Sequence, residues 1–125
     1  METIRLRKDG EPVLVEVTCG HAQEGAYAIL LWERDENKIL MEKRGNFLNT
    51  DDDVYELPKP NAGNAGRLVE CICTVVITPP IDKFAVFLTF TQAGKNLGVV
   101  SASGESSQPA VTVDLFAALE MEGGD

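Results

Sequence analysis

The sequence predicts an all-β protein, an antiparallel two-sheet β-sandwich of about eight strands. Apolar and polar residues alternate along most of the chain, turn-forming residues separate the alternating runs, and the long helical segments that parallel crossovers require are missing. With 125 residues, 44% of them hydrophobic, the chain can bury a core without disulfides or metals. We therefore expect a single domain over residues 1–122, followed by a frayed tail over residues 123–125.

The first half of the sequence predicts two β-hairpins. Over residues 3–18, apolar and polar residues alternate on both sides of Asp9-Gly10, a pair that suits a type I′ turn because both central positions need positive φ. Residues 26–34 and 38–43 are two further apolar runs that flank a short polar turn. Each pair of runs is therefore expected to fold back on itself.

The second half predicts a long strand and a third hairpin. Residues 67–78 place five apolar side chains on one face and end at Pro79-Pro80, which cannot continue a strand ladder. Residues 83–92 alternate in the same way and turn back into residues 96–102. Both segments are therefore expected to contribute their alternating apolar residues to the core.

The end of the chain carries two competing signals. Residues 110–113 have the β-branched content of a strand, whereas residues 114–121 have enough helix-forming residues for two helical turns. We expect a strand that can finish in a short C-terminal helix. An immunoglobulin-like or related Greek-key tracing fits these strands, although Trp32 does not lie between the two suitably spaced cysteines of immunoglobulin domains. The expectation concerns architecture, and architecture does not determine function.

Charge and composition narrow the classes of partner. The chain has 20 acidic and 11 basic residues, a net charge of −9, so it repels phosphate groups and we expect no nucleic-acid partner. No apolar run is long enough for membrane insertion, and the charged, alternating start is unlike a secretory signal. The chain has 3 cysteines, which is an odd number and too few for a disulfide framework. These observations together predict a cytoplasmic protein.

The segment over residues 45–66 is unusually long for a connection between two strands, with room only for a short strand over residues 54–57. Long loops are either mobile or functional, which makes this segment the first place to look for a site. Asp51, Asp52 and Asp53 offer the oxygen ligands that calcium prefers. Because the glycine and glutamate of a calcium-binding EF-hand loop are missing, a solvated acidic turn is the better interpretation, and we expect no metal.

Catalytic groups are scarce. His21 is the only histidine, and no third group that could orient it for Cys19 is identifiable from the sequence. Cys71 and Cys73 lie in an apolar stripe and are expected to be buried free thiols rather than zinc ligands. An enzyme that uses Cys19 or His21 is therefore the least favoured hypothesis, and we expect no cofactor.

Two segments are apolar on both strand faces, namely residues 67–77 and 84–90. A sandwich strand normally buries only one face, so we expect the second face to be partly covered. The cover could be the C-terminal residues Leu115, Phe116 and Leu119, or a second copy of the chain in a homodimer.

The leading hypothesis is a non-catalytic β-sandwich module that acts by binding a protein partner or by self-association. The alternative from a different class is a small-ligand or carbohydrate-binding domain that uses the 45–66 loop, with calcium as an optional ligand. Aromatic rings and carboxylates are the expected contact groups. The candidate residues are Trp32, Asp51, Asp52, Asp53 and Tyr55.

Overall fold

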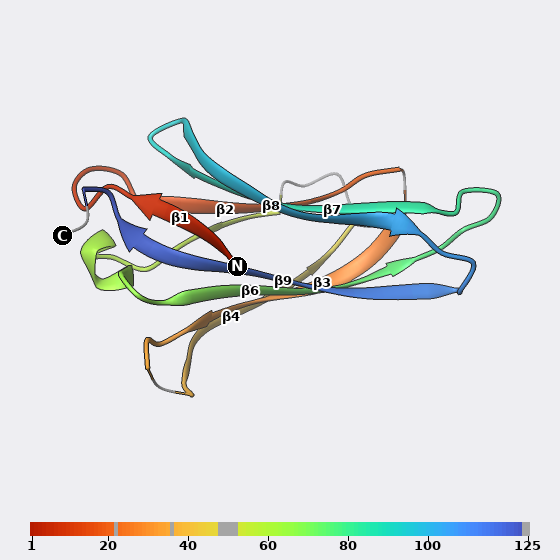
Figure 1. Cartoon of the computed structure of the whole chain (residues 1–125), viewed down its shortest axis with the longest axis horizontal. Coiled ribbons are helices and arrows are strands. Elements are labelled where there is room, and N and C mark those ends of the chain that lie inside the picture. Colours follow the sequence, from red (N-terminus) through yellow and green to blue (C-terminus); the bar gives the residue numbers. More distant parts are fainter. Residues whose placement is uncertain (22, 36, 48–52, 124–125) are drawn as a thin grey trace.

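A computed structural model describes residues 1–21, 23–35, 37–47 and 53–123. Two β-sheets pack face to face (Figure 1), which confirms the predicted sandwich. The described residues form nine strands and one short 3-10 helix. The strands are β1 (Glu2–Leu6), β2 (Val13–Cys19), β3 (Glu24–Trp32), β4 (Ile39–Asn46), β5 (Val54–Glu56), β6 (Leu68–Val76), β7 (Lys83–Gln92), β8 (Lys95–Glu105) and β9 (Ala110–Met121), and the helix is η1 (Asn61–Asn64).

The strand order differs between the two sheets. The five-stranded sheet has the order β1-β9-β6-β3-β4, and the four-stranded sheet has the order β5-β2-β7-β8. Every neighbouring pair is antiparallel except β1 and β9, which run parallel. The predicted β3–β4 and β7–β8 hairpins are both confirmed, and their turns bend away from the two layers (Figure 1).

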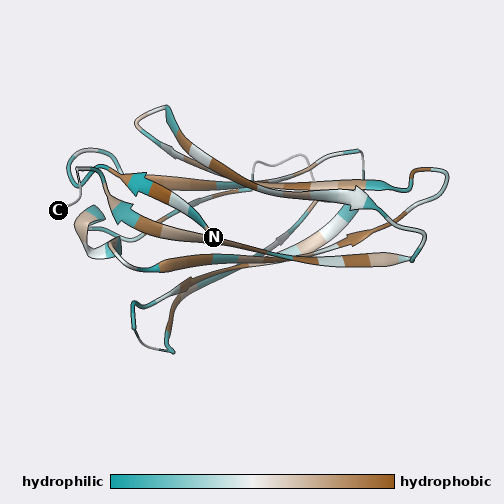
Figure 2. Ribbon diagram, in the orientation of Figure 1, coloured by the Kyte–Doolittle hydropathy of each residue, from teal (hydrophilic) through white to brown (hydrophobic). Residues whose placement is uncertain are grey.

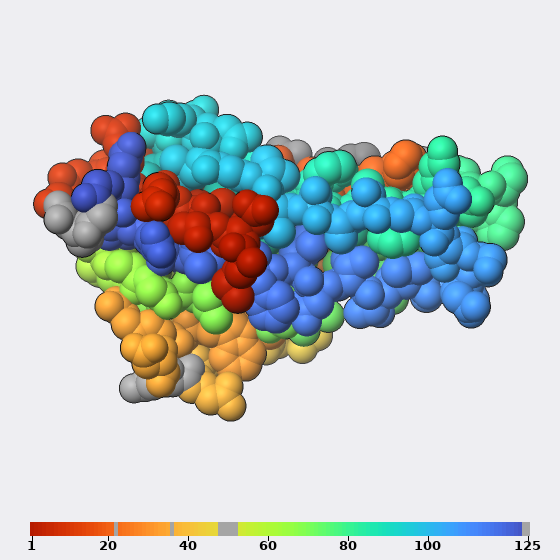
Figure 3. All heavy atoms as spheres, viewed as in Figure 1, coloured from red at the N-terminus to blue at the C-terminus, as the bar shows by residue number. Residues whose placement is uncertain are grey.

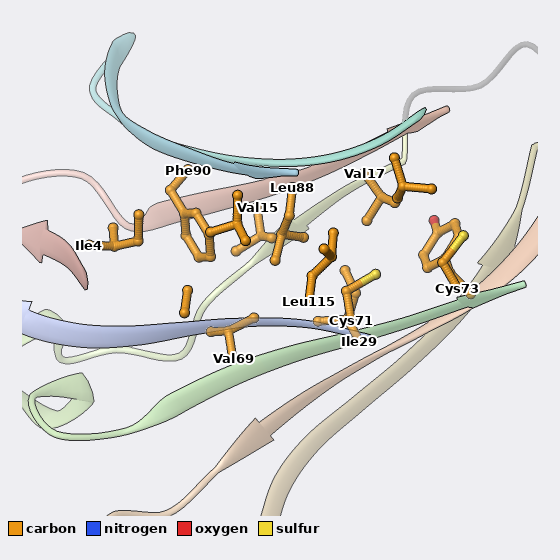
Figure 4. Close-up of a cluster of buried hydrophobic side chains, with 14 of the residues drawn as sticks. Ile4, Val15, Val17, Ile29, Val69, Cys71, Cys73, Leu88, Phe90 and Leu115 are labelled. Carbon is orange, nitrogen blue, oxygen red and sulfur yellow. The ribbon is translucent and has the colours of Figure 1, made fainter. Parts of the chain in front are cut away.

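The core lies between the sheets and follows the predicted alternation. Phe90 and Leu88 point from the four-stranded sheet toward Val69 and Cys71 of the five-stranded sheet, and all four are fully buried (Figure 4). The ribbon accordingly shows apolar and polar bands that alternate along the strands (Figure 2). Burial of apolar area is worth about 25 cal/mol per Å², so this interlayer contact is the main source of stability.

The predicted hairpin over residues 3–18 is wrong, because its two strands belong to different sheets. β1 pairs in parallel with β9, with Ile4 opposite Leu119, whereas β2 pairs with β5 and β7, with Val15 opposite Phe90. Alternation identifies a strand and its buried face but does not identify its neighbour. In the space-filling view β1 lies against β8 and β9 and closes this side of the sandwich (Figure 3).

The predicted C-terminal helix is also wrong, because β9 continues as a strand to Met121. β9 has β6 on one side and β1 on the other, so hydrogen bonding to both neighbours outweighs the helix propensity of its last residues. Leu115 and Leu119 consequently face the core. Phe116 points to the outer side of the sheet and is half-buried. The C-terminal segment is therefore part of the five-stranded sheet rather than its cover.

The described part of the 45–66 segment is fixed by two buried asparagines. Asn61 donates a hydrogen bond to the carbonyl of Glu11 (3.0 Å), and Asn64 donates one to the carbonyl of Pro58 (2.9 Å). They form the ends of η1. The short strand predicted in this segment is present as β5, and it pairs with β2. No helix among the described residues has the length and apolar character needed to cross a membrane.

Two buried glutamines fix the ends of the sandwich where strand ladders stop. Gln92 accepts a hydrogen bond from the Arg7 amide (2.9 Å) and donates to the carbonyls of Arg7 (2.8 Å) and Glu11 (3.0 Å). Gln23 does the same for the turn over residues 78–83, accepting one backbone hydrogen bond and donating two. Each side chain therefore holds two separate backbone segments together.

Candidate functional site

Asp53 and Tyr55, two of the predicted contact residues, are engaged inside the fold. Tyr27 is only 4% exposed. Its hydroxyl donates a hydrogen bond to Asp53 Oδ1 (2.5 Å) and lies 2.6 Å from the Tyr55 hydroxyl. The rings of Tyr27 and Tyr55 meet edge to face, 6.1 Å apart. Burial and the hydrogen bond to Asp53 raise the pKa of Tyr27. This arrangement attaches the end of the long loop to β3.

Asp51 and Asp52 lie outside the described residues, so the calcium hypothesis for the 45–66 loop stays a prediction. Asp53 is already an acceptor for Tyr27. Over residues 1–21, 23–35, 37–47 and 53–123, no group of three or more histidine, cysteine or acidic side chains is placed to hold a metal ion. The described end of the loop is therefore attached to the core through the hydrogen bond between Asp53 and Tyr27.

The three cysteines are free thiols in environments that disfavour the thiolate. Cys71 and Cys73 are fully buried in the core, and burial raises the pKa of each to about 12. Cys19 is half-buried, and burial raises its pKa as well. His21 follows on an exposed turn with φ of 60°. A reactive cysteine needs a lowered pKa, so these environments do not favour nucleophilic catalysis.

Trp32, the remaining predicted contact residue, lines an open hollow of about 480 Å³ on the outer face of the five-stranded sheet. We call it the Trp32 hollow. Trp32 stands opposite Leu68 in the ladder between β3 and β6, and Phe116 of β9 stands opposite Glu70 of β6. The turn between β3 and β4 supplies the rest of the wall. The lining residues are Trp32, Glu33, Asp35, Asn37, Leu68, Glu70 and Phe116.

Glu70 connects the hollow to a second carboxyl group. Glu70 is only 7% exposed, and its Oε1 accepts a hydrogen bond from the Trp32 indole N–H (2.9 Å). Asp114, one strand away on β9, also hydrogen-bonds to Glu70, and desolvation with this bond and the charge of Glu70 raises the pKa of Asp114 from 3.8 to about 6. Asp114 therefore keeps its proton to a higher pH than an ordinary aspartate does.

Glu33, one of the lining residues, forms an ion pair with Arg67, which does not itself line the hollow. Arg67 Nε lies 3.2 Å from Glu33 Oε1, and Arg67 also donates to Asn64 Oδ1 (3.0 Å). The hydrogen bond from Arg67 lowers the pKa of Glu33. The pair thus fixes the start of the β3–β4 turn against the segment that precedes β6.

Glu70, Asp114, Leu68 and Phe116 were missed as site residues by the sequence reasoning. A signal for Glu70 was present, because strand parity places this charged residue among apolar neighbours on the outer face of β6. Asp114 and Phe116 required the β6–β9 register, which the expected C-terminal helix would have abolished.

Family models, curated protein sequences and solved structures give no match to this chain. An open, mostly apolar depression with a few directed polar groups is the usual form of a binding site. Two aromatic side chains beside paired carboxyl groups can pack against an apolar group and hold a hydrogen-bond donor.

The carboxyl pair predicts a specific pH dependence of stability. Because the folded state raises the pKa of Asp114, it holds this proton more tightly than the unfolded chain does between pH 3.8 and about 6. The free energy of unfolding, relative to the Asp114→Asn variant, should therefore fall as the pH rises through this window and stay constant above it. Urea unfolding of both proteins over this pH range measures the difference. A difference that is flat with pH, or that rises, would contradict the raised pKa of Asp114.

Proposed function

We propose that this chain is a non-catalytic β-sandwich module that binds a protein partner through the outer face of its five-stranded sheet. The observation that carries the proposal is the Trp32 hollow, where an aromatic ring and apolar side chains remain accessible on a face that is usually polar in a sandwich. Tryptophan is the residue type most enriched among side chains that dominate binding energy. Trp32 is also the only tryptophan of the chain.

The accessible apolar surface continues beyond the hollow. A second depression of about 300 Å³ lies next along the same face and includes Leu30, Ile72 and Thr74. Ile72 and Val76 of β6 are 37% and 44% exposed. A contact surface that spans both depressions supports binding of an extended peptide segment of a protein partner.

A different protein is a better occupant than a second copy of this chain. A two-fold interface places the same patch of both copies together. Asp35 and Glu70 line the hollow, so a homodimer that placed two such hollows together would oppose acidic groups to acidic groups. The free thiols fit the cytoplasmic location that we include in the proposal.

Selection from a displayed library of random peptides tests the proposal. Peptides enriched on the wild-type chain should lose binding to the Phe116→Ser variant, because this change removes one wall of the hollow. The matched control is Phe87→Ser, since Phe87 is 37% exposed on the other sheet. Peptides that bind both variants equally well, or a selection without enriched peptides, would overturn the proposal.

Sedimentation velocity over a range of concentrations separates the two kinds of occupant. We expect a monomer for the wild type. A dimer that Phe116→Ser dissociates and Phe87→Ser leaves intact would replace the foreign partner with a second copy of the chain.

A further inference from the structure

Glu70 is a buried acidic side chain that forms no salt bridge with any residue that the structure describes. Its identified hydrogen-bond partners are the neutral indole N–H of Trp32 and the carboxyl group of Asp114. Buried carboxylates are normally paired with a cation, because removing an unpaired charge from water is costly. The salt bridges among the described residues join other groups: Arg5 with Glu120, Arg44 with Glu42, and Arg67 with Glu33.

The walls around Glu70 are apolar and aromatic. Trp32, Leu68 and Phe116 line the hollow beside it, and no lysine or arginine among the described residues does so. Asp35 adds an acidic group at the rim. A ligand that fits this combination carries a positive charge on an aliphatic stem, so that the stem packs on the walls while the charge reaches the carboxylates.

We propose that the Trp32 hollow binds a basic side chain of the protein partner, with arginine preferred to lysine. The inference rests on the proposed function, since it names the chemistry of the partner at the same surface. A guanidinium group is planar and presents several N–H donors, so it can bond to the Glu70 carboxylate, beside which Asp114 adds a second acidic group, and stack on an aromatic ring. The ammonium group of lysine supplies the positive charge but lacks the planar set of N–H donors and the flat surface that stacks on a ring. The net charge of −9 favours approach of a basic partner.

Trp32 fluorescence reports binding in the hollow directly, because the chain has 1 tryptophan. The probes are the blocked amino acids Nα-acetyl-arginine methylamide, the lysine equivalent, and the citrulline equivalent, which has the shape of arginine without its charge. We expect a saturable change in emission with the arginine probe in the millimolar range, and weaker binding of the lysine probe. Citrulline should bind about tenfold more weakly than arginine, a difference of about 1.4 kcal/mol. Equal binding of arginine and citrulline would overturn the inference.

The Glu70→Gln variant isolates the role of the buried charge. Glutamine retains an oxygen that can accept the Trp32 N–H, so the wall keeps its shape while the negative charge is lost. We expect about tenfold weaker arginine binding, or about 1.4 kcal/mol. Glu120→Gln is the control, since Glu120 is an acidic residue of β9 that pairs with Arg5 and lines neither of the two depressions. Asp114 is exposed, so the Asp114→Asn variant should lose less arginine binding than Glu70→Gln does. This variant also removes a negative charge beside the hollow and serves as the test if Glu70→Gln does not fold. Unchanged binding in the folded charge variants would refute the site.

The outcomes distinguish this inference from the function on which it depends. Library peptides that require Phe116 but contain no basic residue would refute the basic side chain and leave the binding surface intact. Arginine binding in the hollow, combined with peptides that ignore Phe116, would instead support the charge site and refute the proposed surface.

Discussion

Replacement of Phe90 with alanine is expected to lower the free energy of unfolding by about 3–5 kcal/mol, one of the two largest effects predicted for this chain. Phe90 is fully buried between the sheets and is the largest of the fully buried side chains. The loss combines the transfer of the ring to water with the cavity that remains, because the surrounding strands are hydrogen-bonded on both sides and relax only partly. Urea unfolding followed by circular dichroism measures it.

Phe87→Ala is the internal control for this prediction. Phe87 lies on the same strand, β7, but at opposite parity, and it is 37% exposed on the outer face. Its replacement should cost about 1 kcal/mol or less, since most of its contact area is not in the core. Equal losses at the two positions would contradict the assignment of inner and outer faces.

Replacement of Gln92 with leucine is expected to cost about 3 kcal/mol, although leucine is apolar and the site is buried. Gln92 is 2% exposed and makes three hydrogen bonds to the backbone of Arg7 and Glu11. Leucine leaves one amide and two carbonyl groups without these partners, and unsatisfied buried polar groups are costly. The measurement is the shift of the urea midpoint at constant slope, which separates a change in stability from a change in compactness.

The matched substitution is Gln108→Leu, on an exposed segment before β9. The Gln108 side chain makes none of the buried contacts that Gln92 makes, so this variant should stay within about 0.5 kcal/mol of the wild type. An equally small loss of stability in Gln92→Leu would contradict the role of the Gln92 side chain in holding β1, β2 and β7 together at that end of the sandwich.

Sequence reasoning predicted strands and their buried faces well, but their partners less reliably. The alternation in β6 and β7 identified the inner residues, including Val69, Cys71 and Phe90, because side-chain direction is a local property of a strand. Two hairpins were also predicted correctly from their short turns, whereas the short turn at Asp9-Gly10 joins strands of different sheets. The pairing of β1 with β9 could not be inferred in this way, because it depends on which distant edge is free once the other strands have assembled.

The site was less accessible to sequence reasoning than the fold. Trp32 was identified from its residue type, whereas its neighbours Glu70 and Phe116 come from two strands that are far apart in the chain. The same limit applies to Gln92, whose three hydrogen bonds cross from β7 to the start of the chain. A polar residue at a core position is visible in a sequence, but the backbone groups that it serves are visible only in the folded protein.

The parallel pairing of β1 with β9 has a consequence for the order in which this protein can be made. β9 lies inside the five-stranded sheet, with β1 on one side and β6 on the other, yet it is the last of the nine strands to be synthesised. While the ribosome is still translating, β1 lacks its neighbour and β6 has one open edge. Completion of this layer therefore waits until β9 has been synthesised and has left the ribosome, and the nascent protein exposes these edges until then.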